Sequence, residues 1–209
     1  MFKMTRTIGL SVALAATSVA GAQATTRLAV APTSKLWIEG TSNVHDWKCE
    51  ATTIDAAIDV DAAASQLATP LPRALKKVAV NVPVKSLKCG HGPMDDNMYK
   101  ALQADDNAEI SFIMATFEAL PADSANAFIV RATGTLRVAG AENPLTMDVL
   151  ATRLPEGTIK AVGTVPIKMT AFGVKPPTAI FGTIKTGDEV KVKFELTVGP
   201  RVVVATIDK

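Results

Sequence analysis

The sequence is poor in the residues from which most catalytic and nucleic-acid-binding sites are built. Only 5% of its 209 residues are aromatic, and it has two cysteines and two histidines. So few aromatic residues argue against a surface that stacks bases or sugars. The sequence also lacks a glycine-rich phosphate loop, a His-Glu-x-x-His zinc motif and a cluster of paired carboxylates. These absences favour a protein that is not an enzyme and has no resident cofactor or metal.

An excess of charge of one sign is missing as well. Lys3 and Arg6 precede an uncharged run, residues 7–24, that is rich in Ala, Leu and Val and ends in Ala22-Gln23-Ala24. A basic start, a short apolar run and an Ala-x-Ala end are typical of a cleaved secretory signal peptide. Without Lys3 and Arg6, the 22 basic residues become 20 and equal the 20 acidic ones. The mature chain, residues 25–209, is therefore close to neutral, which argues against binding to nucleic acid.

Long apolar runs are also absent. The run at residues 7–24 is interrupted by polar residues and glycine and is shorter than the roughly 20 residues that span a bilayer. No later stretch is long and apolar enough to span a bilayer either. We predict a single domain over residues 25–209, exported to a bacterial periplasm, with no integral membrane segment after cleavage.

What the mature chain does have is two-residue alternation, which places apolar and polar side chains on opposite faces of a strand. It is clearest at residues 189–198, where Val192 and Phe194 share one face and Lys191 and Lys193 share the other. The same alternation predicts further strands at residues 34–41, 54–60, 78–84, 109–120, 128–138, 145–151 and 159–169.

Short polar turns separate these strands, and short links favour antiparallel hairpins over parallel crossovers. The predicted turns are residues 40–43, 123–126, 140–144 and 155–157. About eight strands in a meander favour closure into a barrel, because closure removes exposed sheet edges.

Two segments interrupt the meander. Residues 62–74 predict a loop with a short helical turn, and residues 93–103 predict a helix, because Pro93 suits a first turn and Asp95 and Asp96 complement the helix dipole. The predicted fold class is all-β, an antiparallel eight-stranded barrel with one or two short helices.

The faces predicted to point inward carry few large side chains. Ala132, Gly134, Ala151, Ala161 and Gly163 are small, and phenylalanine is outnumbered there by Val, Ile, Ala and Gly. An eight-stranded barrel is just wide enough to be filled by side chains or to hold one slim ligand. Small inward residues therefore favour a hollow interior, in which an apolar chain would gain about 0.8 kcal/mol per buried methylene. The alternative is a flattened barrel, in which small residues bring the strands closer together.

A hollow barrel predicts its own binding residues. We expect Met94, Met98 and Leu102, on one face of the helix, to cover one end as an adaptable apolar lid. The predicted ligand contacts are the inward side chains of the strands and this helix: Val80, Phe128, Val130, Ala132, Val149, Ala161, Val165, Val192, Phe194 and Met98.

The cysteines and histidines lie in two short segments, residues 45–49 and 89–91. In an exported chain, two cysteines favour a disulfide between Cys49 and Cys89, which the loop-entropy model values at about 4 kcal/mol. The alternatives are a Cys₂His₂ metal site with His45 and His91, or a catalytic Cys–His pair. His45 and Asp46, beside Trp47, also suit a fixed structural corner.

Several segments of the chain resemble the YceI-like family of exported, lipocalin-like lipid-binding proteins. These segments are residues 34–40, 44–47, 94–102, 109–112, 136–140, 144–148 and 169–177, and the resemblance runs from about residue 34 to 198. It implies a lipocalin-like antiparallel barrel that encloses a long isoprenoid-type lipid without covalent chemistry. The cysteine pair and the apolar tail at residues 201–207 are not part of the general family pattern.

The predicted function is that of a periplasmic binding protein. It would carry or sequester a long-chain isoprenoid-type lipid, an amphiphile whose polar headgroup lies near a mouth of the barrel, and would act as a monomer or dimer. The alternative is a metal- or haem-associated periplasmic accessory protein that uses His45, Cys49, Cys89 and His91. An enzyme that acts on a bound lipid is a third possibility.

Overall fold

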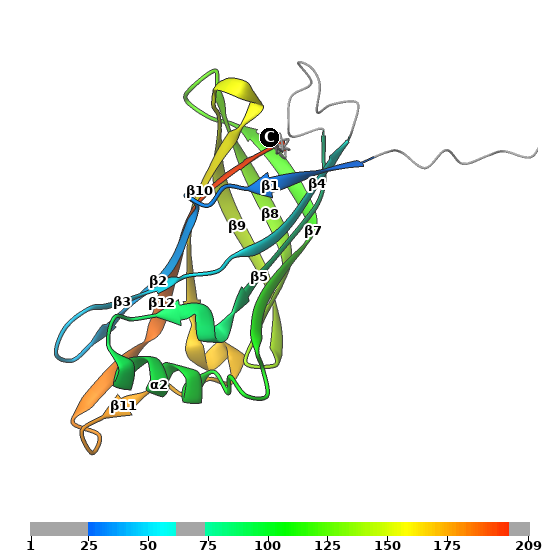
Figure 1. The fold of residues 1–209 in the computed structure, drawn as a ribbon. Coiled ribbons are helices and arrows are strands. Elements are labelled where there is room, and N and C mark those ends of the chain that lie inside the picture. Colours follow the sequence, from blue (N-terminus) through cyan, green and yellow to red (C-terminus); the bar gives the residue numbers. More distant parts are fainter. Residues whose placement is uncertain (1–24, 62–73, 201–209) are drawn as a thin grey trace, which may run out of the picture.

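The computed structural model describes residues 25–61 and 74–200. The predicted signal peptide, nearly all of the loop at residues 62–74 and the apolar tail lie outside the described residues. The described chain forms one antiparallel sheet that curls round until β1 pairs with β12 (Figure 1). The strands are β1 (Thr25–Val30), β2 (Lys35–Ser42), β3 (Trp47–Ala51), β4 (Asp55–Asp61), β5 (Leu75–Pro83), β6 (Leu87–Lys88), β7 (Glu109–Pro121), β8 (Ala127–Val138), β9 (Ala141–Arg153), β10 (Ile159–Lys168), β11 (Thr178–Ala179) and β12 (Ile184–Gly199). The helical segments are the α-helix α2 (Gly92–Ala101) and the 3₁₀ turns η1 (Val84–Ser86), η2 (Pro155–Gly157) and η3 (Met169–Phe172).

Three positions of the barrel are filled by strands that are broken in two. β1 and β2 both pair with β12, while β4 pairs with β1 and β3 pairs with β2. Next round the barrel, β5 pairs with β4 and β6 pairs with β3. The pairs β1/β2, β3/β4 and β5/β6 therefore each act as one strand. Together with β7, β8, β9, β10 and β12 they give the predicted closed barrel of eight antiparallel strands.

Hydrogen bonds that include side-chain groups hold the breaks β1/β2 and β3/β4. At the β1/β2 break, which contains Pro32, the Ser34 hydroxyl accepts a hydrogen bond from the Thr197 N–H of β12 at 3.0 Å. At the β3/β4 break, the Thr52 N–H and hydroxyl both donate to the Ser86 carbonyl of η1, at 2.9 and 3.1 Å. The chain therefore changes direction without leaving these backbone groups unpaired.

All eight strands predicted from alternation are present, but four short strands were not predicted: β1, β3, β6 and β11. The turn predicted at residues 40–43 is wrong, because Gly40 lies inside β2, paired with Trp47. A side chain there would collide with the indole ring, since a Cβ would lie 2.3 Å from it. The actual turn follows Ser42.

The turn predicted at residues 140–144 is also too long. β9 already begins at Ala141, so the connection between β8 and β9 is the pair Ala139-Gly140. Both residues have positive φ, 47° and 80°, as a two-residue hairpin turn requires. The predicted helix is also shorter than residues 93–103, since it ends at Ala101 and Gln103 has a left-handed φ of 52°.

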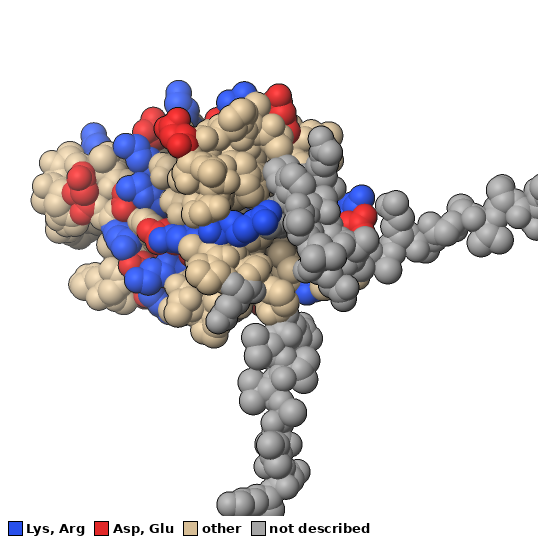
Figure 2. Space-filling view, turned by 90° about the horizontal axis from the view of Figure 1, so that it is seen from above, with Lys and Arg blue, Asp and Glu red and all other residues tan. Residues whose placement is uncertain are grey.

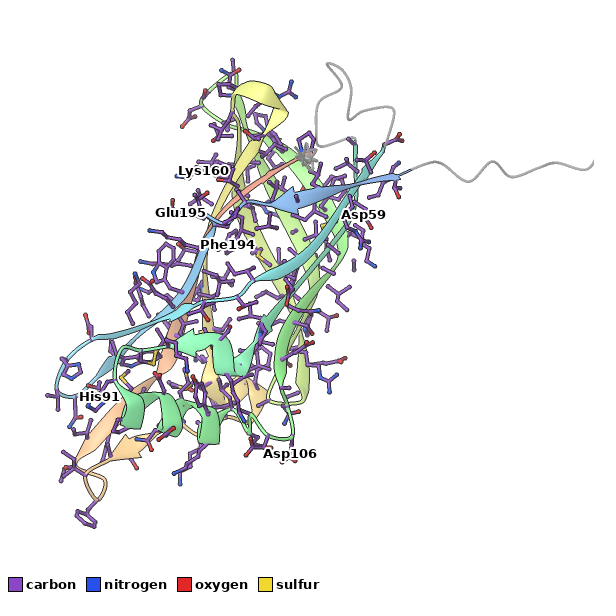
Figure 3. The ribbon with its side chains drawn as sticks, in the orientation of Figure 1. Asp59, His91, Asp106, Lys160, Phe194 and Glu195 are labelled. Carbon is purple, nitrogen blue, oxygen red and sulfur yellow. A yellow bond between two sulfur atoms is a disulfide. The ribbon has the colours of Figure 1, made fainter. Side chains whose placement is uncertain are left out.

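The outer surface carries charges of both signs side by side (Figure 2). On the two adjacent strands β10 and β12, Lys160 pairs with Glu195 at 2.9 Å. Figure 3 shows Lys160 and Glu195 on the outside of the wall, next to Phe194, the inward neighbour of Glu195 on β12. Phe194 is 9% exposed and belongs to a core cluster inside the barrel. Because successive side chains of a strand point to opposite faces, the alternating sequence gives the barrel a charged exterior and an apolar interior.

Candidate ligand-binding cavity

The barrel encloses a cavity of about 670 Å³. Ligand sites in proteins typically measure about 300–1,000 Å³, so this cavity has the size of a binding site. Its lining comes from strands all round the barrel and from α2, η3 and β11. Among the described residues that line it, none is Asp, Glu, Lys or Arg. An interior of this composition favours a long apolar molecule.

All ten residues predicted to contact a ligand line this cavity. They are Val80, Met98, Phe128, Val130, Ala132, Val149, Ala161, Val165, Val192 and Phe194. Strand alternation, and for Met98 helical periodicity, therefore predicted the face that lines the cavity. Their contact with a ligand stays a prediction.

Two of the inward glycines do not contribute empty space. A Cβ on Gly163 would lie 2.3 Å from the ring of Phe194, its cross-strand partner, and a Cβ on Gly134 would lie 2.8 Å from the ring of Phe112. The phenyl rings therefore fill the room above these glycines. The interior is hollow, as predicted, but less so than the count of small residues indicates.

Several lining residues were not predicted. Phe112 and Met114 follow from the alternation of the predicted strand at residues 109–120, so extending the inward stripe would have found them. Phe172 lies in η3 and Trp47 in the unpredicted β3, where no two-residue pattern marks the inward face.

The polar side chains of the lining are gathered at one end. Ser42 and Thr186 face each other across the pairing of β2 with β12, and Thr178 lies on β11, which pairs with the first residues of β12 at the same end. α2 closes this end of the barrel, and Figure 3 shows His91 at its start. The lining residues with a hydroxyl, imidazole or amide are Ser42, His45, His91, Asn97, Thr178 and Thr186. We call this end the polar mouth.

The segment around His45 is a fixed corner, as one interpretation predicted. The Ser42 hydroxyl donates to the His45 carbonyl at 2.7 Å and accepts the His45 N–H at 3.1 Å. The His45 Nδ1 lies 2.8 Å from the Asp46 carbonyl oxygen, so this histidine contacts backbone rather than the Asp46 carboxylate.

Cys49 and Cys89 form a disulfide, which confirms the predicted pairing. Because both sulfurs are bonded to each other, they are not available as thiolate ligands or nucleophiles. The Cys₂His₂ site and the catalytic Cys–His pair therefore do not form. Among residues 25–61 and 74–200, no group of three or more His, Cys, Asp or Glu side chains is placed to hold a metal ion.

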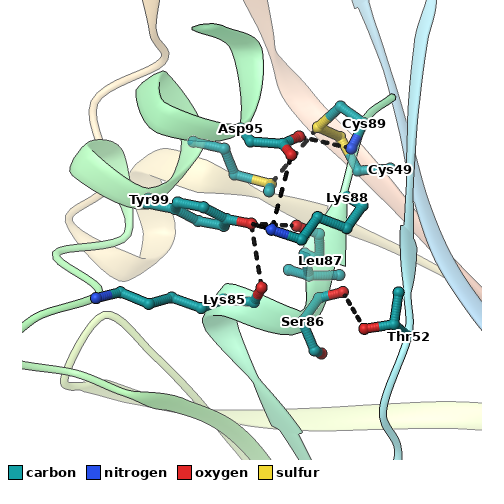
Figure 4. Close-up of polar contacts among 10 residues, drawn as sticks. Cys49, Thr52, Lys85, Ser86, Leu87, Lys88, Cys89, Asp95 and Tyr99 are labelled. Carbon is teal, nitrogen blue, oxygen red and sulfur yellow. Dashed lines mark hydrogen bonds and ion pairs between the residues drawn. A yellow bond between two sulfur atoms is a disulfide. The ribbon is translucent and has the colours of Figure 1, made fainter. Parts of the chain in front are cut away.

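A small polar network fastens α2 to the wall beside this disulfide (Figure 4). The Tyr99 hydroxyl donates to the Leu87 carbonyl at 2.7 Å and accepts a hydrogen bond from the Lys88 Nζ at 2.7 Å. The second of these bonds raises the pKa of Lys88. The Asp95 carboxylate accepts the Cys89 N–H at 2.7 Å. These bonds hold the methionine face of α2 over the polar mouth, where Met94 and Met98 line the cavity.

The model of one protein family, the YceI-like domain, matches residues 28–198. Among solved structures, Burkholderia cenocepacia BcnA is similar, with a TM-score of 0.60 and 20% identity over 78% of this chain and 95% of that one. A polyisoprenoid-binding domain from Saccharophagus degradans, implicated in plant cell wall breakdown, has a TM-score of 0.60 and 12% identity, covering 84% and 98%. The Campylobacter jejuni YceI protein has a TM-score of 0.54 and 18% identity, covering 73% and 84%.

Curated proteins give no match to this chain. Within the part of the chain that the structure describes, no helix has the length and hydropathy needed to cross a membrane.

Proposed function

The chain belongs to the YceI-like domain family, and from this premise we propose that it binds a long-chain isoprenoid-type lipid inside its barrel without covalent chemistry. The observation that carries the proposal is the cavity of about 670 Å³ inside the barrel, whose described lining contains no Asp, Glu, Lys or Arg. Each methylene moved from water into such a space gains about 0.8 kcal/mol, before the entropy cost of binding is subtracted. The similar fold of a polyisoprenoid-binding domain supports the same class of ligand.

The polar mouth supports an orientation for this ligand. Side chains such as Asn97, Thr178 and Thr186 offer hydrogen bonds there, while the rest of the lining is apolar. We propose that the headgroup lies at the mouth under α2 and that the chain extends between the contacts Val130, Val149 and Val192. Because the described lining offers no Lys or Arg to neutralise a phosphate, we propose an uncharged headgroup, such as an alcohol or a ketone.

The proposed role is transport or sequestration in the periplasm rather than catalysis. The Ser42 hydroxyl is bonded to backbone and the two cysteines are bonded to each other, so these groups do not form an activated nucleophile. The disulfide and the predicted signal peptide both favour an oxidising compartment.

The direct test is to purify the protein from its own host without detergent and to analyse it for bound lipid. Native mass spectrometry and solvent extraction should show a lipid in about one-to-one ratio with the chain. If no lipid is found and added isoprenoid alcohols do not bind, the proposal is wrong.

Two substitutions on β10 test the location of the site. Ala161→Phe places a ring in the cavity and should abolish or strongly weaken binding, whereas Thr164→Phe, on the exposed face of the same strand, should leave it unchanged. Equal binding by both variants would place the ligand elsewhere.

The headgroup is tested with two ligands that share one chain. An isoprenoid alcohol should bind more tightly than the corresponding isoprenoid phosphate, since a buried phosphate would have no Lys or Arg partner in the described lining. Tighter binding of the phosphate would show that the headgroup lies outside the polar mouth.

A further inference from the structure

Three large apolar side chains protrude into solvent at the end of the barrel that carries the polar mouth. Val44, in the loop between β2 and β3, is 62% exposed, and Ile180 and Phe181, in the turn between β11 and β12, are 65% and 109% exposed. Figure 1 shows this turn at the lower end of the barrel, the end that α2 covers. We call these three residues the apolar tip.

The two loops of the apolar tip form one unit. The Asn43 side-chain amide donates to the Thr183 carbonyl at 2.8 Å, and its oxygen accepts the Lys185 N–H at 2.8 Å. The Asn43 N–H also donates to the Lys185 carbonyl at 3.1 Å. Val44 is therefore held beside the turn that carries the other two side chains.

The turn keeps its apolar residues at a conformational cost. Ile180 and Phe181 have positive φ, 49° and 52°, a region that favours Asn, Asp and Gly in hairpin turns and is costly for a β-branched residue. The Thr183 hydroxyl donates to the Ile180 carbonyl at 2.7 Å and helps to fix this conformation. Large apolar side chains in strained, exposed positions are not explained by the stability of the barrel.

The apolar tip is also continuous with the cavity. Ile180 lines the cavity together with Pro177, Thr178 and Ala179, the residues that lead into the turn. A chain that leaves the cavity past these residues therefore passes directly along the tip.

We propose that the apolar tip inserts into the surface of a lipid bilayer and places the polar mouth against it, so that the ligand enters and leaves without crossing water. This inference rests on the proposed function. A protruding wedge of three apolar side chains suits the soft interface of a bilayer, into which aromatic and aliphatic groups bury a short distance. Lys175 and Lys185, exposed on either side of the turn in sequence, favour anionic lipids, and Asp46 is an exposed acidic neighbour.

The test compares two double variants by sedimentation with vesicles of phosphatidylethanolamine and phosphatidylglycerol. Val44→Ser with Phe181→Gly removes apolar groups that are not among the described lining residues, and glycine suits the positive φ at residue 181. The control is Ile113→Ser with Leu150→Ser, which removes exposed apolar groups, 56% and 44% exposed, from the barrel wall. We expect the tip variant to lose vesicle binding and vesicle-to-vesicle transfer about ten-fold or more, with the control unchanged.

Binding of a fluorescent isoprenoid alcohol in detergent solution is measured in parallel and should be the same for both variants and the unaltered protein. Vesicle binding that survives in the tip variant, or falls equally in the control, would overturn the inference. So would a tip variant that changes the oligomeric state instead, because a second copy would then cover the tip. The unaltered protein could also fail to bind the alcohol and still bind vesicles through the tip. That result would refute the proposed function but not the inferred membrane contact.

Discussion

The barrel has two kinds of wall. Along one side, β7, β8, β9, β10 and β12 are long strands, and all but the pair β9–β10 share extended ladders. On the other side, β1/β2, β3/β4 and β5/β6 are broken strands that share shorter ladders. The three largest side chains that are almost fully inaccessible, those of Val84, Leu87 and Cys49, all lie on the broken side.

The two walls are therefore stabilised differently. The continuous wall relies on backbone ladders, with ion pairs such as Arg131–Asp148 on its exposed face. The broken wall has fewer backbone hydrogen bonds between its strands. The disulfide, the Tyr99 network and the Ser86–Thr52 bonds stabilise it near one end. The lid and four of the six polar-mouth residues, Ser42, His45, His91 and Asn97, belong to this cross-linked side, where the binding site has fixed side chains rather than long strands.

The largest expected effect comes from removing the disulfide. Cys49→Ala with Cys89→Ala should lower the free energy of unfolding by about 4 kcal/mol, because the unfolded chain regains the freedom of a 40-residue loop. Urea unfolding measures this loss, and reduction of the unaltered protein should reproduce it. Hydrogen exchange should show the loss first in β3, β6 and α2, with β8 and β9 still protected. Uniform loss of protection would mean that the two walls are not distinct.

Substituting one glycine in each wall compares how tightly the two walls are packed. Gly163, in β10, and Gly40, in β2, each lie under an aromatic ring of the paired strand, and a Cβ at either would be 2.3 Å from it. Phe194 is enclosed and Trp47 is half-buried at the mouth, so Phe194 has less room to move. Gly163→Ala should cost about 1–3 kcal/mol and Gly40→Ala less, measured by urea unfolding. The reverse order would show that the indole is the more rigid of the two rings.

The two walls also differ in how well the sequence predicts them. Alternation predicted every strand of the continuous wall and the inward faces of β8, β9, β10 and β12, including Val130, Val149 and Val192, because a long period-two pattern leaves little choice of register. On the broken wall it gave one half of each strand and missed β1, β3 and β6, which are too short for a periodic signal.

The sequence pattern predicts a turn at Gly40, although the absence of a side chain there makes room for Trp47 across the sheet. The polar mouth was not predicted for a related reason. Its residues come from segments far apart in the sequence, and only closure of the barrel brings Ser42, Asn97 and Thr178 to one end.

Removing one hydroxyl group from the cross-linked side should have a smaller effect on stability than removing the disulfide. Tyr99→Phe removes the hydrogen bond to the carbonyl of Leu87, a residue that is 1% exposed, and should lower the free energy of unfolding by about 1–2 kcal/mol. Thr133→Val is the control, since its hydroxyl shares a 3.0 Å hydrogen bond with Thr146 on the exposed face of the continuous wall. We expect the control to be nearly neutral. An equal loss of unfolding free energy in both variants would contradict the claim that the Tyr99 network specifically stabilises the broken wall.

The smallest expected effect is the acid sensitivity of two equivalent ion pairs. Arg27–Asp59 joins β1 to β4 and Arg131–Asp148 joins β8 to β9, each through two hydrogen bonds to the carboxylate. In both pairs the arginine hydrogen bond lowers the carboxyl pKa below its ordinary value of 3.8. A lowered folded-state pKa gives stability that is complete above the ordinary value and lost as the pH falls through the folded one.

The Asp59 side chain is 15% exposed and the Asp148 side chain 49%, so solvent screens the second pair more. Asp59→Asn should therefore lower the urea midpoint at pH 7 measurably and Asp148→Asn hardly at all. Both differences from the unaltered protein should shrink toward zero as the pH falls below 3.8 and through the lowered folded-state pKa of each carboxyl, and should weaken in high salt. A larger effect at Asp148 would show that the continuous wall also depends on its side-chain pairs, and the contrast between the two walls would fail.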